Sequence, residues 1–179
     1  MRGALTGTIV SSAFAVAWSF WGSSGLHFFA ALCVQLAATL LGLVIIISAL
    51  RRLFGSAPGA PSQNRTLFSS RAFVVVVVAE VLAIIGGNLV LTATGQQQFR
   101  IALIAAIVGL HFVVFGRLFW SGFSWLGAAM LAVALAGTVV GLTTGNADLI
   151  LVTTGLGSAA SLFIAAVPPL LHRRVASAD

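Results

Sequence analysis

The sequence predicts an all-α protein, a bundle of six transmembrane helices that forms a single domain over residues 1–179. Two observations lead to this fold class. First, 60% of the residues are apolar and only 7% are charged, a composition far from that of soluble globular domains. Second, the apolar residues form continuous runs that are long enough to cross a hydrocarbon core of roughly 30 Å as helices. These runs lack the alternation of polar and apolar residues that transmembrane β-strands require.

A membrane-spanning helix needs about 20 apolar residues, and six segments of the chain meet this requirement. Charged or turn-forming residues separate each segment from the next. We place the six spans at residues 4–21, 26–50, 72–94, 101–120, 123–143 and 149–171.

The longest connection, residues 55–70, lies between the second and third spans. Gly, Pro, Ser and Asn are frequent in this segment and no apolar periodicity runs through it, so we expect a flexible cytoplasmic loop. The other connections are short. Ser121 and Gly122 alone separate the fourth and fifth spans, which predicts an antiparallel hairpin.

The sixth span carries signals at both of its ends. Asn146 is expected to cap the first turn, and Asp148 would lie in that turn, where the helix dipole favours a negative charge. Pro168 and Pro169 are expected to end or kink the helix, because proline cannot donate the backbone hydrogen bond of a helix interior.

The placement of arginine predicts the orientation, because positively charged loops are retained in the cytoplasm during insertion. Only Arg100 falls on the outer side. The predicted cytoplasmic side carries the others, which are Arg2, Arg51, Arg52, Arg65, Arg71, Arg117, Arg173 and Arg174. Both termini are therefore predicted in the cytoplasm, in a multi-pass protein of the cell inner (plasma) membrane.

The formal net charge of +6 follows from these arginines. Basic residues beside a span attract anionic lipid headgroups by about 1 kcal/mol each, so the lipid bilayer is the expected partner. Nucleic-acid binding is not expected, since no basic module lies outside the spans.

Glu80 interrupts the third span, which is otherwise apolar. A carboxylate inside the bilayer is costly and commonly marks a proton or ligand site. At about 1.5 Å per residue, Glu80 lies roughly 12 Å from the cytoplasmic end of its span, and His111 lies roughly 15 Å from the outer end of the fourth. Both therefore fall near the midplane on neighbouring antiparallel helices. Gln35 and Ser158 fall at a similar depth.

The sequence leaves two partners open for Glu80. His111 is the neighbour by depth, and Arg117, about 120° round the same helix, is near enough to reach up from the cytoplasmic end. Glu80 is not expected to face both squarely. One partner of this kind is expected, because an isolated buried charge is unfavourable.

Polar residues on the outer side of Glu80 allow two interpretations. Asn88, together with hydroxyl groups on several spans, would line a pocket that opens outward and ends at Glu80 and His111. Alternatively, these side chains bond neighbouring backbone carbonyls, as hydroxyls commonly do in membrane helices. The hydroxyl-bearing residues concerned are Thr92, Thr138, Thr153 and Thr154.

No cofactor and no metal are expected. His27, His111 and His172 lie at outer, middle and inner levels, so they do not converge on one ion. Cys33, the only cysteine, is expected as a small core residue of the second span. An enzyme is less expected than a non-enzyme, because no nucleophile accompanies Glu80 and His111.

Aromatic residues gather where the membrane interfaces are expected, and we interpret them as anchors at the headgroup level without a ligand role. The outer group consists of Trp18, Phe20, Trp21, Phe28 and Phe29, and the inner group of Phe119, Trp120, Phe123 and Trp125.

Small residues recur every four positions on the last two spans, a pattern that lets helix backbones approach closely. Helix packing within the chain and a homodimer or partner-protein interface both fit this pattern. The residues are Gly137 with Gly141, Gly155 with Ala159, and Gly157 with Ser161 and Ala165.

Glu80 in the third span and the sequence Gly-Leu-His-Phe at residues 109–112 in the fourth resemble a group of small, uncharacterised multi-span bacterial membrane proteins. The resemblance covers about a quarter of the chain. It implies no activity for this chain.

Two functions fit these features. The first is a small transporter-like or ligand-binding protein, in which Glu80 takes up a proton or binds a small molecule and His111 serves as relay or partner. The second is a non-transporting accessory or scaffold subunit of a membrane complex, in which Glu80 is sealed against His111 or Arg117. A cavity that reaches Glu80 would favour the first.

Overall fold

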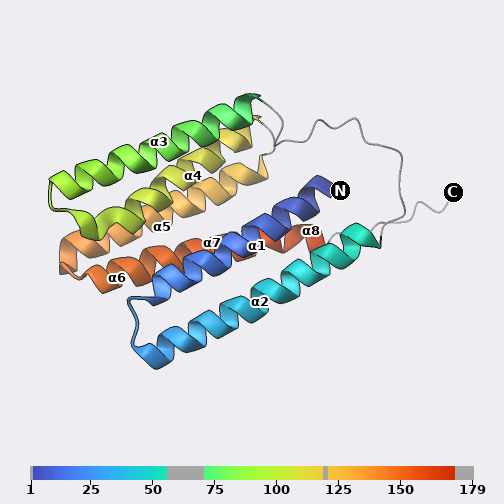
Figure 1. The fold of residues 1–179 in the computed structure, drawn as a ribbon, viewed down its shortest axis with the longest axis horizontal. Helices are drawn as coiled ribbons and strands as arrows, with labels where there is room; N and C mark the ends of the chain where they lie inside the picture. The colour runs from blue at the N-terminus through green and yellow to red at the C-terminus, as the bar shows by residue number, and fades with distance from the viewer. Residues whose placement is uncertain (1, 56–70, 119–120, 172–179) are drawn as a thin grey trace.

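The computed structural model describes residues 2–55, 71–118 and 121–171, which form helices joined by short turns (Figure 1). No β-strand occurs among these residues. Six of the helical segments are long and apolar enough to cross a membrane. The prediction of an all-helical, six-span architecture is confirmed, and this architecture is compatible with an integral membrane protein.

Five of the spans are single helices whose ends lie within a few residues of the predicted ones. The largest difference is at the second span, where the helix continues through Arg51 and Arg52 because arginine is a good helix former. A short 3₁₀ turn, Gln97–Phe99, leads into the fourth span. The five helices are α1 (Arg2–Ser23), α2 (Phe28–Phe54), α3 (Arg71–Ala93), α4 (Arg100–Leu118) and α5 (Gly122–Thr144).

The sixth span is built from four consecutive pieces rather than from one regular helix. It begins and ends with α-helical segments, and a single π-helical turn interrupts it. The pieces are α6 (Ala147–Leu151), the π turn (Val152–Leu156), α7 (Gly157–Ala166) and α8 (Pro168–Leu171).

Local signals determine both ends of this span, as predicted. The Asn146 side chain accepts hydrogen bonds from the backbone N–H groups of Asp148 and Leu149, at 2.9 and 3.2 Å. At the other end, α7 stops at Ala166 and a new helical turn starts at Pro168, because proline cannot continue the backbone hydrogen bonds of α7.

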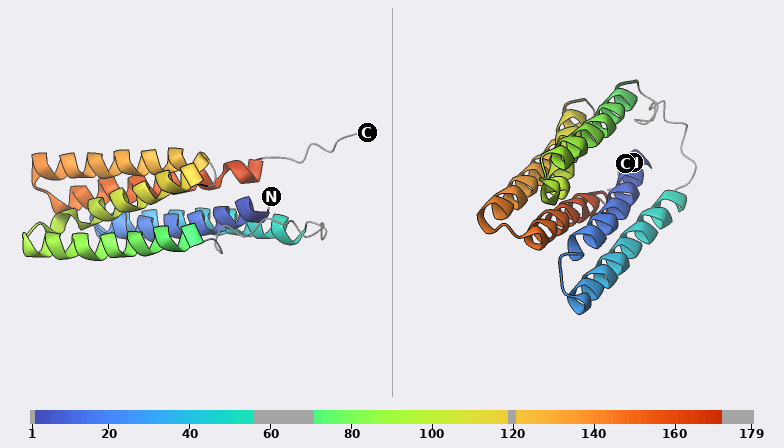
Figure 2. Two further views of the ribbon diagram at one scale, coloured as in Figure 1. Left: turned by 90° about the horizontal axis from the view of Figure 1, so that it is seen from above. Right: turned by 60° about the vertical axis from the view of Figure 1, so that its left-hand side comes forward.

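The helix α1 lies at the centre of the bundle, between α2 on one side and α7 with the π turn on the other (Figure 1). The helices α4 and α5 form the predicted antiparallel hairpin, and α5 also packs on α6 and α7. The helix α3 lies at the edge, where it contacts α4 and the turn that precedes α4. Figure 2 shows α1, α2 and α3 in one layer and α5, α6 and α7 in another, with α4 inclined between them.

Small and hydroxyl-bearing residues bring α1 close to the sixth span. A Cβ atom built on Gly22 would lie 2.5 Å from the backbone nitrogen of Leu156, so this position requires glycine. Near the other end of α1, the Thr8 hydroxyl donates a hydrogen bond to the carbonyl of Ala166 at 3.2 Å. Ala15, between them, is fully buried. These contacts fix α1 and α7 against each other.

The recurring small residues of the last two spans are used within the chain. A Cβ atom on Gly137 would clash with the Thr154 side chain, and a Cβ atom on Gly157 would lie 2.7 Å from the side chain of Val133. This is the intrachain packing that the pattern allowed. Association with a second copy or with a partner protein stays a prediction.

The starts of α1, α3 and α5 and the ends of α2, α4 and α8 lie at one end of the bundle (Figure 1). Arg100 lies at the opposite end, where its guanidinium donates a hydrogen bond to the Thr92 hydroxyl at 2.9 Å. The first end carries Arg51, Arg52, Arg71 and Arg117. Outside the described residues lie His172, Arg173, Arg174 and residues 56–70, which include Arg65 and most of the segment predicted to be a flexible cytoplasmic loop.

Candidate functional site

Glu80 and His111 form a close pair between α3 and α4. Oε2 of Glu80 lies 2.6 Å from Nδ1 of His111, and the two side chains are 18% and 11% exposed. At this distance the carboxylate and the imidazole are in direct contact. Of the two partners left open by the sequence, the structure places His111 beside Glu80. Arg117 is exposed in the last turn of α4.

The sequence of α3 gives Glu80 its direction. Phe73, Glu80 and Ile84 follow one another at helical spacings and therefore share one face of α3. This face is less exposed than the rest of the helix, which has no fully buried residue. Glu80 is thus carried on the face that α3 turns toward its neighbours.

Two glycines bring α3 and α4 together. Gly95 ends α3 in the left-handed conformation, with a φ of +70°, which reverses the chain direction. A Cβ atom on Gly87 would lie 2.6 Å from the Leu103 side chain, so glycine lets α4 approach α3 there. The tight turn and the close approach place Glu80 and His111 at matching heights.

Aromatic rings enclose the His111 ring. The ring centroids of Phe115 and Phe112 lie 4.0 and 5.5 Å from that of His111. Phe115 stacks on Phe73 of α3 at 5.4 Å, and Phe112 stacks on Phe123 of α5 at 5.9 Å. These stacks tie α3 and α5 to α4 on the arginine-rich side of the pair.

Glu80 and His111 line a cavity of about 520 Å³ between α1, α3 and α4. Apart from this pair and Ser11, the described lining residues are aliphatic or aromatic. The volume falls within the range of small-molecule sites, roughly 300–1,000 Å³. One wall comes from α1 and consists of Gly7, Val10, Ser11, Phe14, Ala17, Trp18 and Trp21.

Aromatic side chains line both ends of this cavity. Phe73, Phe115 and Phe123 lie at the arginine-rich end, and Trp18 and Trp21, whose rings stack at 5.5 Å, lie at the other. The helix α3 packs mainly on α4 and has few close backbone contacts with α1. On the α1 wall, Val10 and Phe14 are exposed. We therefore expect the cavity to open between α1 and α3, on the side of the bundle.

Gln35 and Ser158, which the sequence placed at the same depth, do not line this cavity. Nε2 of Gln35 donates a hydrogen bond to the Ser23 hydroxyl at 3.0 Å and so links α2 to α1. Ser158 is fully buried on α7, and its hydroxyl has no hydrogen-bond partner among the described residues. A binding role for either residue stays a prediction.

The outward polar passage considered from the sequence is not part of the cavity, since neither Asn88 nor the four threonines line it. Nδ2 of Asn88 donates to the carbonyl of Ile84 at 2.8 Å. The hydroxyls of Thr92 and Thr138 each donate to the carbonyl four residues earlier, at 2.8 and 2.9 Å. For these three residues, bonding to the helix backbone satisfies the side chain, which was the alternative interpretation. A binding role for Asn88 remains untested.

Three aromatic residues interpreted as interfacial anchors line the cavity instead: Trp18, Trp21 and Phe123. Trp18 is only 6% exposed. The spacing of Trp18 and Trp21 places both on one face of α1, which is a signal in the sequence that could have indicated a shared position. Phe119 and Trp120 lie outside the part of the chain that the structure describes.

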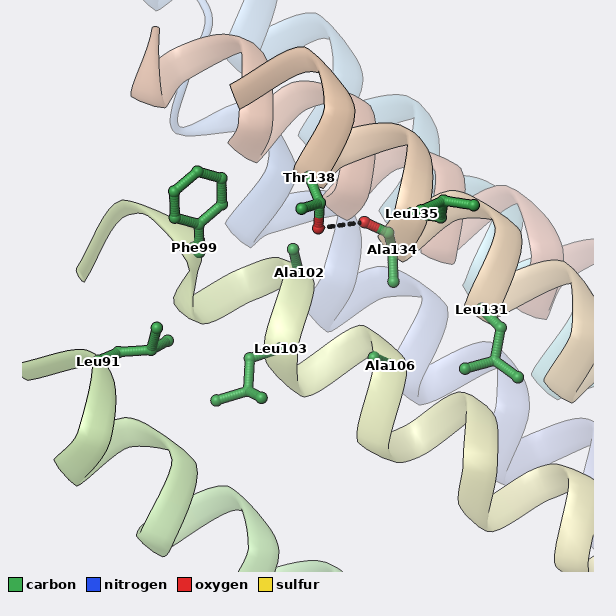
Figure 3. A pocket seen from close by; sticks show the side chains of 9 residues that line it. All are labelled: Leu91, Phe99, Ala102, Leu103, Ala106, Leu131, Ala134, Leu135 and Thr138. Atoms are coloured by element: carbon green, nitrogen blue, oxygen red, sulfur yellow. Dashed lines mark hydrogen bonds between the residues drawn. The ribbon is translucent and has the colours of Figure 1, made fainter. Parts of the chain in front are cut away.

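A second hollow, of about 400 Å³, lies beside α4 between α3 and α5 (Figure 3). Thr138 is the one polar side chain among its described lining residues, and its hydroxyl already donates to the carbonyl of Ala134, as the dashed line in Figure 3 marks. No polar group there is left to orient a ligand. The hollow suits hydrocarbon chains rather than a specific small molecule.

Within the described residues, no three His, Cys, Asp or Glu side chains gather in a way that would hold a metal ion. Cys33 was predicted to be a core residue, and this prediction is wrong, because its side chain is exposed. The cause is the face that α2 turns to α1, which buries Ala38, Gly42, Ile45 and Ala49 instead.

The chemistry available in the cavity is that of a carboxylate beside an imidazole. Such a pair exchanges protons and binds cations or hydrogen-bond donors. Comparison of the chain with protein-family models, with curated proteins and with solved structures found no match. The cavity and its two titratable side chains are therefore the features from which a function can be inferred.

Proposed function

We propose that this chain is a small transporter-like or ligand-binding membrane protein whose site is the cavity lined by Glu80 and His111. Glu80 binds the ligand or a proton, and His111 acts as its partner and proton relay. The observation that carries the proposal is the position of the pair on a cavity of about 520 Å³. A purely structural ion pair needs no such space.

The alternative, an accessory or scaffold subunit, fits this arrangement less well. A buried ion pair is expensive to desolvate, and well-packed apolar residues of similar volume often stabilise a protein as much or more. A scaffold would therefore gain little from Glu80 and His111 unless packed side chains enclosed them fully. Their exposure to an open cavity supports a binding role.

The same proposal includes a location. We place the bundle end that carries Arg51, Arg52, Arg71 and Arg117 in the cytoplasm, following the retention of positive charge on that side. Both termini are then cytoplasmic, in the inner membrane of a bacterium. The cavity lies at mid-membrane depth, with its opening facing the hydrocarbon of the bilayer.

Carbodiimide labelling tests the site without knowledge of its ligand. Dicyclohexylcarbodiimide is lipophilic, and a protonated carboxyl adds across its C=N bond to give an O-acylisourea. Its acyl group then migrates from oxygen to nitrogen and gives a stable N-acylurea that keeps all atoms of both reactants. We expect this reagent to label Glu80 in membranes, because the cavity opens toward lipid. Mass spectrometry of the intact chain and of its peptides measures the adduct.

Two controls accompany this experiment. In the first, Glu80→Gln should give no adduct with the lipophilic reagent. In the second, a water-soluble carbodiimide should label Asp148, which is exposed. If Glu80 stays unlabelled in a folded, fully helical protein, the pair is sealed. That outcome would contradict the proposal and favour the accessory role.

A further inference from the structure

Charge sets the first requirement for a ligand of the cavity. Among the described lining residues, the titratable side chains are Glu80 from α3 and His111 from α4, and the residues contributed by α1, α5 and α7 carry none. Glu80 is thus the one lining group that carries a negative charge. Whenever His111 is neutral and Glu80 is ionised, the cavity is negative, and a carboxylate in apolar surroundings attracts a cation.

Aromatic rings set the second requirement. The face of such a ring carries partial negative charge and attracts a cation within about 6 Å. Trp18 and Trp21 line one end of the cavity, Phe73 and Phe115 line the other, and much of the wall between them is aliphatic. These surfaces favour an apolar molecule that carries a single positive charge.

The route into the cavity sets the third requirement. Val10 and Phe14 on the α1 wall are 41% and 58% exposed, so the opening beside α3 faces outward from the bundle. From Gly7 to Trp21 this wall extends for about 21 Å along the helix axis. A molecule dissolved in the hydrocarbon of the membrane reaches Glu80 through this opening, whereas a strongly hydrated ion does not.

We propose that the cavity binds a lipophilic organic monocation from the lipid phase, with Glu80 as its counter-ion. This inference rests on the proposed function and adds the class of ligand. When the cation arrives, the proton held by Glu80 and His111 leaves to water, so that one positive charge replaces another. Glu80 and His111 both line the cavity, so a ligand there can approach the carboxylate directly.

Tetraphenylphosphonium and tetraphenylborate are a matched pair of probes, since they share shape and apolar surface and differ in the sign of their charge. Calorimetric titration of the purified full-length protein in detergent measures the binding of each. We expect saturable binding of the phosphonium and none of the borate. Phosphonium affinity should fall as the pH falls, because protons compete for Glu80, and titrations in two buffers of different ionisation enthalpy should report proton release.

Variants locate the binding. Glu80→Gln should weaken phosphonium binding by at least about tenfold. If Glu80→Gln fails to fold, Gly7→Leu serves as a second test variant. Gly7 lines the cavity, and a Cβ atom built there meets no described atom within 4 Å, so the leucine side chain can be accommodated. Gly3 has the same steric freedom and does not line the cavity, so Gly3→Leu is the matched control. We expect Gly7→Leu to weaken binding and Gly3→Leu to leave it unchanged.

Equal binding of the two probes would overturn the inference, as would phosphonium binding that both Glu80→Gln and Gly7→Leu leave unchanged. Uptake by the detergent micelle alone would explain either result. If carbodiimide labels Glu80 but the phosphonium does not bind, the inferred ligand class is wrong and the proposed site stands. If neither reagent reaches Glu80, the proposed function falls as well.

Discussion

Glu80 and His111 differ in energetics from an ion pair on a water-exposed surface. An exposed pair contributes about 0–1 kcal/mol because water screens it. Glu80 and His111 are largely enclosed, so removing one partner leaves the other with little solvent to replace it. Such a loss costs about 1–3 kcal/mol. Each residue is therefore expected to affect stability through the other.

His111→Ala should lower the free energy of unfolding by about 1–3 kcal/mol, because it leaves the Glu80 carboxyl without its partner. In a Glu80→Gln background the same substitution should cost less, since an amide carries no charge to compensate. Denaturant titration in detergent, followed by circular dichroism, measures both values, and their difference is the coupling energy of the pair. Equal costs in the two backgrounds would mean that the residues are not coupled. Arg117→Gln, at an exposed position, should change little.

The sequence reduced the partners of Glu80 to two candidates, whereas the surroundings of the pair could not be predicted. A helix rises by a fixed amount per residue, so depth made His111 a neighbour of Glu80. The structure was needed to place His111, rather than Arg117, beside the carboxylate. For Trp18 the depth says little about the direction of the side chain. The face that α1 turns to the cavity depends on its packing against α7, which is distant in the sequence. Ala, Ser and Gly occur all around α1, so the distribution of polar and apolar residues does not show which face of the helix is turned to the cavity.

Among the helical elements, the sixth span departs most from regular geometry. At its π turn, the backbone N–H of Gly157 is directed at the carbonyls of Thr153 and Thr154. The wider turn accommodates an extra residue, and Gly155 within it makes a backbone contact with Gly22 of α1. The distortion thus occurs where two spans approach each other closely.

Gly22→Ala tests this approach. The added Cβ atom would lie 2.5 Å from the nitrogen of Leu156 and 2.7 Å from the carbonyl carbon of Gly155, and these backbone atoms cannot swing away as a side chain would. We expect a loss of about 1–3 kcal/mol in unfolding free energy. Gly86→Ala on α3 is the control, because a Cβ atom there meets no described atom within 4 Å. Equal thermal unfolding of the two variants in detergent would contradict the close packing of α1 on the π turn.

Helix ends were predictable where the signal is local. Asn146 caps α6 through the N–H groups of residues two and three positions later, which the sequence alone supplies. Pro168 interrupts the sixth span for a reason that is equally local. The π turn was not predictable, since its fit depends on Gly22 of α1. Small residues at Gly155 and Gly157 indicated close packing without indicating which helix would pack there.

On the scale of the whole molecule, the arrangement of α3 creates the opening of the cavity. This helix leans on α4 at the edge of the bundle and hardly contacts α1, the central helix (Figure 1). Hydropathy predicted the number of spans, but it does not show which helices pack against each other. The position of the cavity, between the first and third spans, therefore required the structure.

Labelling with a membrane-impermeant maleimide in intact bacterial cells tests the orientation. After Cys33→Ser removes the native thiol, a cysteine is introduced at Gln97 or at Ser121, exposed positions in turns at opposite ends of the bundle. We expect Gln97→Cys to react from outside and Ser121→Cys to react only after permeabilisation, because we propose that the arginine-rich end faces the cytoplasm. The reverse pattern would place both termini outside.

Infrared spectroscopy observes most directly whether Glu80 exchanges its proton through the open cavity. The chain has only three acidic side chains, so a difference spectrum between acidified and neutral samples contains few carboxyl bands. We predict a carbonyl-stretching band of protonated Glu80 that appears on acidification, shifts in D₂O and disappears in Glu80→Gln. A spectrum in which no Glu80 band responds to pH or to D₂O would contradict an accessible, titrating Glu80 and would identify the pair as sealed.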